Sequence, residues 1–305
     1  MKVDPACGEV NQTQLVKMKF IEKLINISRK NNSLLCVGLD TDLEKIPKLL
    51  LKDHDPIFSF NQKIIDSTHD LVCAYKPNIA FYEAYGSKGW EALKKTCETI
   101  PKEIPIIIDA KRGDIGNTAR MYAKAIFENL GADALTVNPY MGEDAISPFL
   151  EYENKCALIL CLTSNKSAQD FQLSLLKIPP KAGIDGKPLY QIVAEKVLSW
   201  NKKGNCGLVV GATYPEQLKK VREIAKSLPI LIPGVGAQSG ELESTVKFGT
   251  DEKGERAIIN SSRAIIYASQ KEDFAEAARD EALKLRDRIN LCRSREAGSF
   301  GQTTE

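Results

Sequence analysis

Short, continuously apolar runs alternate with longer amphipathic stretches along most of the chain. A strand that is buried on both faces has such a run, because both of its sides contact apolar neighbours. We predict eight strands of this kind, at residues 33–40, 71–78, 104–111, 132–139, 156–163, 206–213, 229–235 and 256–263.

The stretches between these runs show the periodicity of amphipathic helices. Residues 117–130 place apolar side chains at helical spacing and end before Gly131, which suits the position after a helix C-terminus. Residues 190–200 and 215–228 show the same pattern, and Pro215 suits a first helical turn. Residues 271–288 are strongly charged, but their apolar positions fit a packed final helix.

Eight strands that alternate with helices over roughly 250 residues predict an α/β protein with a single-domain (β/α)₈ barrel, the TIM barrel. A doubly wound open sheet is the structural alternative. We expect the barrel at residues 14–297, after an N-terminal extension at 1–13 and before a flexible tail at 298–305. Residues 164–187 form a long connection, of a length often found in lids and binding loops.

Charge and composition exclude several classes of protein. The net charge of +2 provides no general basic field for nucleic acid. The N-terminus lacks the apolar core of a secretory signal, and no run of 18 apolar residues is present to span a membrane. His54 and His69 lack metal-ligand spacing. We expect reduced, buried thiols and a cytoplasmic protein, because no C-x-x-C pair occurs and five cysteines lie in apolar runs: Cys36, Cys73, Cys156, Cys161 and Cys206.

Polar or glycine-rich chemistry follows seven of the eight apolar runs. In a (β/α)₈ barrel the carboxyl ends of the strands face the active site, so these residues should gather at one rim. They are Asp40, Lys76 with Asn78, Asp109 with Lys111, Asn138, Thr163 with Ser164, Gly234 with Gly236, and Arg263.

Residues 108–118, IDAKRGDIGNT, are the strongest chemical signal. Asp109 and Lys111 are two apart at a strand end, so their side chains share one face. Asp114 follows where a helix begins, and Lys76 terminates the second strand. Two lysines and two aspartates therefore alternate in charge around one point. The alternative is a buried ion-pair network that only orients loops.

A phosphate site is predicted at the last two strands. The segment PGVGAQSG, residues 233–240, provides backbone N–H groups that side chains do not block. Arg263 is placed to donate hydrogen bonds to two phosphate oxygens, and barrels often bind phosphate at this place.

The pattern Asp-x-Lys-x-x-Asp-Ile-x-x-Thr, from Asp109 to Thr118, resembles the signature of the orotidine 5′-phosphate decarboxylases. The segments GLD at 38–40, YKPNIAFYE at 75–83, PGVGAQ at 233–238 and NSSR at 260–263 resemble the same family, in its order. The likeness is to its longer bacterial and protozoan-like branch. Ser262 stands where the family pattern has glycine. The larger serine side chain would crowd the phosphate, but Arg263 stays in place.

The resemblance implies a role for each matching residue. Lys111 would protonate C6 of the pyrimidine as CO₂ leaves, and Asp109 would lie beside the substrate carboxylate. Lys76 would hold Asp109 and a ribose hydroxyl, Asp40 would bind ribose, and Asn78 would lie near the reacting end.

The remaining implied contacts involve the base, the phosphate and a second subunit. Ser164, with Thr163 beside it, would bind the pyrimidine edge. Asp114 and Thr118 would reach into the neighbouring subunit's site, which implies a homodimer with shared active sites. An orotate phosphoribosyltransferase is a further candidate partner. Gln238 and Arg263 would bind the phosphate, and the other substrate-binding residues expected beside them are Pro233, Gly234 and Ser262.

The implied reaction converts orotidine 5′-phosphate to uridine 5′-phosphate (UMP), the last step of pyrimidine biosynthesis to UMP, without metal or organic cofactor. Elementary chemistry agrees with this role. The electrons left on an sp² carbon have no neighbouring carbonyl to accept them, so the site must act through a fixed cation that donates a proton.

Three other functions remain open at this point. A keto-sugar-phosphate decarboxylase or hexulose-phosphate synthase would share Asp-x-Lys-x-x-Asp but needs Mg²⁺ and an acidic ligand where this chain has Lys76. A Schiff-base aldolase would use Lys111 as its nucleophile, although two nearby aspartates favour the charged amine. The last alternative is a catalytically inactive nucleotide-binding barrel.

Overall fold

A computed structural model describes residues 18–176, 186–235 and 239–299. Eight strands form one sheet in the order β2-β1-β10-β9-β8-β5-β4-β3, and the neighbours within it are parallel. The strands are β1 (Leu35–Leu39), β2 (Ala74–Pro77), β3 (Ile107–Arg112), β4 (Ala134–Val137), β5 (Cys156–Leu162), β8 (Cys206–Val210), β9 (Ile230–Pro233) and β10 (Ala257–Ser261).

Two further parallel bridges bring the ends of this sheet together. Tyr75 pairs with Ile106, and Asn78 pairs with Asp109, so β2 lies beside β3 and the sheet closes. Seven of the eight strands lie within a predicted apolar run, and β3 extends one residue beyond its run, to Arg112. The predicted barrel is confirmed, and the open sheet is excluded.

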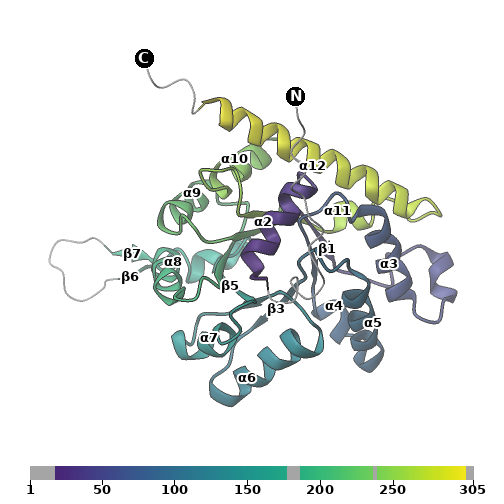
Figure 1. Ribbon diagram of the computed structural model, residues 1–305, viewed down its shortest axis with the longest axis horizontal. Coiled ribbons are helices and arrows are strands. Elements are labelled where there is room, and N and C mark those ends of the chain that lie inside the picture. The colour runs from purple at the N-terminus through teal and green to yellow at the C-terminus, as the bar shows by residue number, and fades with distance from the viewer. Residues whose placement is uncertain (1–17, 177–185, 236–238, 300–305) are drawn as a thin grey trace, which may run out of the picture.

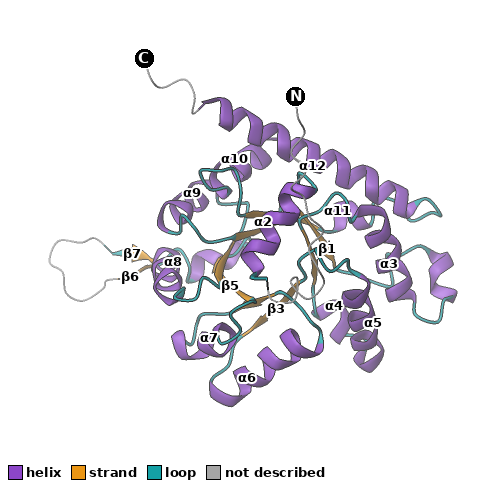
Figure 2. Ribbon diagram, in the orientation of Figure 1, coloured by secondary structure: helices purple, strands orange, loops and turns teal. Residues whose placement is uncertain are grey.

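Helices surround the strands on the outside (Figures 1 and 2). They are α3 (Pro56–Thr68), α4 (Ala80–Glu83), α5 (Gly86–Thr99), α6 (Gly116–Lys124), α7 (Glu143–Leu150), α8 (Leu189–Trp200), α9 (Pro215–Ile224), α10 (Ser239–Gly249), α11 (Arg263–Ile266) and α12 (Phe274–Ser299). Short 3₁₀-helices occur at Lys48–Lys52 and Lys166–Asp170.

The remaining helix, α2 (Phe20–Lys30), lies across the amino-terminal end of the barrel (Figure 1). The Phe20 N–H donates to the Asn154 carbonyl just before β5. Lys23 forms an ion pair of 2.7 Å with Asp133, just before β4. The opposite, carboxyl rim is therefore the end left for a site.

The predicted helices differ from the observed ones in detail. The stretch 117–130 is not one regular helix, since α6 passes into a π-helical turn at Ala125–Asn129. There the Leu130 N–H donates to the carbonyl five residues earlier, at Ala125. Pro215 does begin α9, but that helix ends at Ile224 and not at residue 228. The final helix is longer than predicted and includes two residues of the expected tail.

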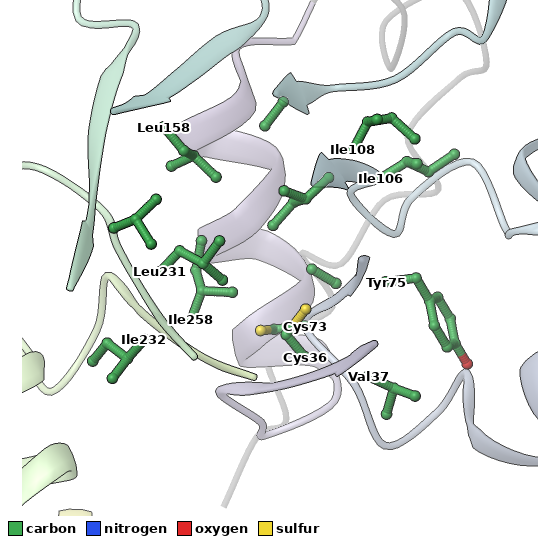
Figure 3. Close-up of a cluster of buried hydrophobic side chains, with 14 of the residues drawn as sticks. Cys36, Val37, Cys73, Tyr75, Ile106, Ile108, Leu158, Leu231, Ile232 and Ile258 are labelled. Atoms are coloured by element: carbon green, nitrogen blue, oxygen red, sulfur yellow. The ribbon is translucent and has the colours of Figure 1, made fainter. Parts of the chain in front are cut away.

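Apolar side chains fill the barrel interior (Figure 3). Ile108, Leu158, Leu231 and Ile258 gather between the strands and are at most 1% exposed. The interior is thus a packed core and not a pore. The five cysteines expected inside the protein are buried free thiols, as predicted.

The long connection after β5 is partly described. It contains a short antiparallel pair, β6 (Leu175–Leu176) with β7 (Lys187–Pro188), while residues 177–185 lie outside the described residues. The predicted extension at 1–13 and most of the predicted tail also lie outside them. Within the described ranges, no helix is both long and apolar enough to cross a membrane.

Candidate active site

Four charged side chains meet at the carboxyl rim of the barrel, and Asp40 takes the place in the cluster that the sequence analysis gave to Asp114. Lys111 Nζ lies 2.6 Å from Asp109 Oδ1, and the other oxygen of Asp109, Oδ2, lies 3.1 Å from Lys76 Nζ. Lys76 Nζ is also 4.0 Å from Asp40 Oδ1. The charges alternate along the row Lys111, Asp109, Lys76, Asp40, which we call the rim array. The register of β1 and β2 explains why Lys76 lies near Asp40, because Lys76 pairs with Gly38, two residues before Asp40.

Burial differs sharply between the two lysines. The Lys76 side chain is 4% exposed, whereas that of Lys111 is 50% exposed. Burial alone lowers the pKa of Lys76, but Asp109 and Asp40 outweigh it and raise that pKa above its ordinary value. Burial also opposes ionisation of Asp109, yet Lys76 and Lys111 together lower its pKa to about 2. Lys76 and Asp109 are therefore both charged at neutral pH.

Asp40 brings an unsatisfied polar atom to this array. Its Oδ1 is buried and accepts no hydrogen bond from any described residue. The backbone of Asp40 is fixed by Tyr267 at the end of α11, whose hydroxyl donates to the Asp40 carbonyl at 2.8 Å. The same hydroxyl accepts from the Asp42 N–H at 2.7 Å. A buried acceptor without a donor is suited to a ligand hydroxyl.

Thr136 on β4 is a member of the site that the sequence analysis missed. Its hydroxyl donates to Asp109 Oδ1 at 3.0 Å and accepts from the backbone N–H groups of Ala110 and Lys111 at 3.0 and 2.9 Å. Thr136 is 1% exposed. The available signal was a polar residue in the middle of an otherwise apolar strand.

Asp114 and Thr118 are not joined to the rim array. The chain turns away after Arg112, and Asp114 Oδ1 accepts from the N–H of its own neighbour, Ile115. Among the described residues, Asp114 has no ion-pair partner. Thr118 is exposed in the first turns of α6.

The ends of β5, β8 and β9 approach one another closely. A Cβ atom on Gly211 would lie 2.7 Å from the Ser164 backbone nitrogen, and one on Gly234 would lie 3.5 Å from the Ser164 hydroxyl oxygen. Because Gly211 and Gly234 have no side chains, Ser164 fits between the strand ends. The neighbouring Thr163 hydroxyl is already engaged, because it donates to Asn165 Oδ1 at 2.6 Å and accepts from Gln172 Nε2 at 2.9 Å.

The remaining predicted base-side residue, Asn78, lies next to Asp109 at the seam of the barrel. Its side-chain oxygen accepts from the Ala80 N–H at 3.2 Å, which holds the turn into α4. Its side-chain amide N–H groups have no acceptor among the described residues.

The predicted phosphate side needs one correction. Arg263 does not end the eighth strand. The β10 ladder stops at Ser261, Ser262 takes φ −121° and ψ −87°, and Arg263 begins α11 with an exposed side chain. Of the other residues predicted here, Pro233 ends β9 and Gly234 follows it, at φ +85°. Gln238 lies outside the described residues, as do residues 236 and 237.

Ser262, the departure from the family pattern, has room at this place. A Cβ on Gly38 would lie only 1.8 Å from the Ser262 hydroxyl oxygen. The missing side chain at Gly38 therefore accommodates the hydroxyl of Ser262 beside β1.

Metal ligands do not cluster in the part of the chain that the structure describes. No group of three or more His, Cys, Asp or Glu side chains there is arranged to hold a metal ion. At the end of β2, the Mg²⁺-dependent alternative expects a carboxylate, and the structure has the Lys76 ammonium, paired with two aspartates.

The barrel and its array of lysine and aspartate side chains define a class, the (β/α)₈-barrel enzymes that act through charged side chains at the carboxyl rim. Residues 33–278 match the model of the orotidine 5′-phosphate decarboxylase / HUMPS family. The chain belongs to that family.

Similar proteins with this name occur in bacteria. An orotidine 5′-phosphate decarboxylase of Dehalococcoides mccartyi is 50% identical over 278 residues, which cover 91% of this chain and 100% of that protein. One from Christiangramia forsetii is 53% identical over 263 residues, covering 85% of this chain and 93% of that protein.

Solved protozoan structures share the fold. The OMP decarboxylase of Leishmania donovani is 38% identical, with a TM-score of 0.77 over 90% of this chain and 99% of that one. A UMP synthase from the same organism is 39% identical, with a TM-score of 0.78 over 90% of this chain and 57% of that one. The bacterial and protozoan relatives agree with the branch that the sequence resembles.

Proposed function

We propose that this protein decarboxylates orotidine 5′-phosphate to UMP, the last step of pyrimidine biosynthesis to UMP, without a metal or an organic cofactor. The rim array is the observation that carries the proposal. Its residues stand at the positions of the family signature, and three of its members form ion pairs within 3.1 Å. Relatives about 50% identical over nearly the full chain carry the name of this activity.

The proposed chemistry needs a cation where negative charge develops. Loss of CO₂ leaves an electron pair on C6 of the pyrimidine. The Lys111 ammonium, half-exposed to the barrel mouth and paired with Asp109, would stabilise that charge and then donate its proton to C6. Asp109, ionised beside the substrate carboxylate, would favour its departure. Buried Lys76 would keep Asp109 charged and in place.

Ribose and base would bind along the same rim. The unsatisfied Asp40 Oδ1 would accept a ribose hydroxyl, and Lys76 would contact a second oxygen of the sugar. Ser164 would bind the pyrimidine edge; Thr163, whose hydroxyl is already engaged, would support it through the strand end. Asn78 would lie beside the reacting end.

The phosphate would bind between the ends of β9 and β10. Arg263 carries an exposed guanidinium at the start of α11, and it makes no ion pair with any described residue. Pro233 and Gly234 would offer backbone beside it. Gln238 and Ser262 would complete the pocket.

The active site would be shared across a homodimer. Asp114 and Thr118 lie off the rim array, so they are free to serve a partner's site. Large apolar side chains are exposed on the same segment at Ile115 and Met121, and after β4 at Tyr140 and Met141, with exposed fractions of 55%, 62%, 86% and 46%. An apolar surface of this kind, adjoining two polar residues, fits a two-fold contact with a second copy.

Purified protein should consume orotidine 5′-phosphate, measured as loss of its ultraviolet absorbance and formation of UMP. Binding of the nucleotide without turnover would instead support the inactive-barrel alternative. Turnover of a keto-sugar phosphate that depends on Mg²⁺ would support the other enzyme class, and borohydride trapping of substrate on Lys111 would support an aldolase.

Mixing two inactive variants tests the shared site. Lys111→Ala and Asp114→Ala are dissociated, combined in equal amounts and reassembled. In a hybrid dimer one site lacks both residues, while the other keeps its own Lys111 and receives Asp114 from its partner. Half of the dimers are hybrids, so activity should recover to roughly a quarter of the wild-type value. No recovery, in a mixture shown to contain hybrids, contradicts the shared site.

The proposal also places the enzyme in the cytosol. Among the described residues, six cysteines are buried and form no disulfide, which is consistent with a reducing compartment. Orotate phosphoribosyltransferase is kept as a candidate partner, and co-purification of the two enzymes is its test.

A further inference from the structure

Strand β3 departs from regular pairing at the rim. Ile108 pairs with Leu135 on β4, and the next pair is Arg112 with Val137. Asp109, Ala110 and Lys111 therefore lie opposite one residue, Thr136. A regular ladder places one residue opposite one, so β3 bulges by two residues where it carries the proposed proton donor.

The Thr136 side chain replaces the backbone hydrogen bonds that a regular β3–β4 ladder would make here. A hydroxyl group has one donor and two acceptor positions, and all three are used here. It accepts from the N–H groups of Ala110 and Lys111 and donates to Asp109 Oδ1, at 2.9 to 3.0 Å. One buried group thus contacts the backbone of the bulge and the carboxylate at the centre of the array.

The backbone of Lys111 needs such support. Its φ is +48°, a left-handed conformation that is strained for a residue with a side chain. Packing cannot provide the restraint, since the Lys111 side chain is 50% exposed. The N–H of Lys111 is fixed by Thr136, and its ammonium is fixed by Asp109, which Thr136 also holds.

We propose that Thr136 is a positioning residue for the decarboxylation: its hydroxyl holds Lys111 in the left-handed conformation and orients Asp109, and so aims the ammonium at the reacting carbon. Thr136 is 1% exposed and acts through these two residues without touching the substrate. The inference rests on the proposed function.

The test removes the hydroxyl with little change of shape. Thr136→Val should lower kcat on the order of 10²-fold, as a displacement of about 1 Å at a reacting group does. UMP affinity should change much less, because the binding groups for ribose and phosphate are untouched. Thr136→Ser, which restores the hydroxyl, should recover most of the lost kcat.

A matched control separates positioning from simple loss of a buried hydroxyl. Thr96 on α5 is fully buried and accepts from Asn61 Nδ2 at 3.0 Å, outside the rim array. Thr96→Val should lower the unfolding temperature and leave kcat unchanged. If Thr136→Val does not fold, Thr136→Ser and Thr136→Ala make the same comparison, since they differ only by the hydroxyl.

Three outcomes overturn the inference: a wild-type kcat in Thr136→Val, a Thr136→Ser variant as impaired as Thr136→Val, or equal losses of kcat and UMP affinity. A crystal structure of Thr136→Val should show Lys111 out of the left-handed region, and an unchanged φ also refutes the proposal. Failure of the wild type to convert orotidine 5′-phosphate overturns the proposed function instead, while the crystal structure still decides what Thr136 holds.

Discussion

Replacing Lys76 with methionine removes the central cation of the rim array. The ammonium lies 3.1 Å from Asp109 and 4.0 Å from Asp40, and its side chain is 4% exposed. Methionine has a similar length and no charge. Two carboxylates would then share a site with one cation, the half-exposed Lys111, so the pKa of Asp109 should rise.

Coulomb's law gives the size of this rise. At an effective dielectric constant of about 20, unit charges 3.1 Å apart interact by about 5 kcal/mol. That energy corresponds to roughly 4 pKa units. Water that enters the site and a closer approach of Lys111 reduce it, so we expect a shift from about 2 to about 5.

The contribution of Asp109 to folding stability should therefore change with pH in the opposite direction in the variant. In the wild type, the low pKa of Asp109 contributes stability that is present above about pH 4 and is lost as the pH falls towards 2. In Lys76→Met, the folded protein binds the proton more tightly than the unfolded chain. Its stability then falls as the pH rises from about 4 to about 5.

Thermal unfolding at a fixed protein concentration measures this difference. The destabilisation caused by Lys76→Met should be about 1.5 kcal/mol larger at pH 7 than at pH 4, or about 2 °C in Tm for a chain of this length. Lys95→Met is the matched control, because Lys95 pairs with Asp55 at 2.9 Å but is 44% exposed, so water screens the pair. A Lys76→Met penalty at pH 4 that equals or exceeds the one at pH 7 would refute the charge-balance argument.

Three further outcomes are expected. Lys111→Ala should abolish turnover and keep the fold, because the side chain is half-exposed at the barrel mouth; more than a few per cent of wild-type activity would remove Lys111 as proton donor. Arg263→Ala should lower kcat/KM, since phosphate binding energy helps to close loops over the base, and an unchanged kcat/KM would mean that the phosphate site is misplaced. Exhaustive treatment with EDTA should leave activity unchanged, whereas a loss that Mg²⁺ restores would favour the keto-sugar-phosphate chemistry.

The fold was predictable because each barrel strand is buried on both faces and so leaves an apolar run. The exact ends of strands and helices were harder to predict. Through residues 260–263 the sequence continues with no glycine or proline, yet the chain leaves the β10 ladder after Ser261 and Arg263 starts a helix. The π-helical turn after α6 was also not predictable, because a single five-residue turn of wider helix barely alters the apolar periodicity.

Most of the charged part of the site was predictable from position alone, but Asp114, which the sequence analysis placed in the cluster, lies off it. Lys76, Asp109 and Lys111 follow apolar runs, and strand ends of a barrel meet at one rim. The role of Thr136 was not predictable, because it depends on a two-residue offset between β3 and β4. Tyr267 was hidden for a similar reason, since only the closed barrel brings α11 against the loop after β1.

The pairing of β1 with β10 has a consequence for how the chain folds. Leu35 lies beside Ile259, so the first strand of the barrel finds one of its two neighbours only when the last strand of the barrel has been made. Until then β1 and β9 each keep an open edge, which invites pairing with other chains. A nascent chain that ends before β10 carries Lys76, Asp109 and Lys111 but neither Ser262 nor Arg263. Because this long-range closure is slow to form, the chain acquires its complete site only after β10 has been made, in one step with the closure of its barrel.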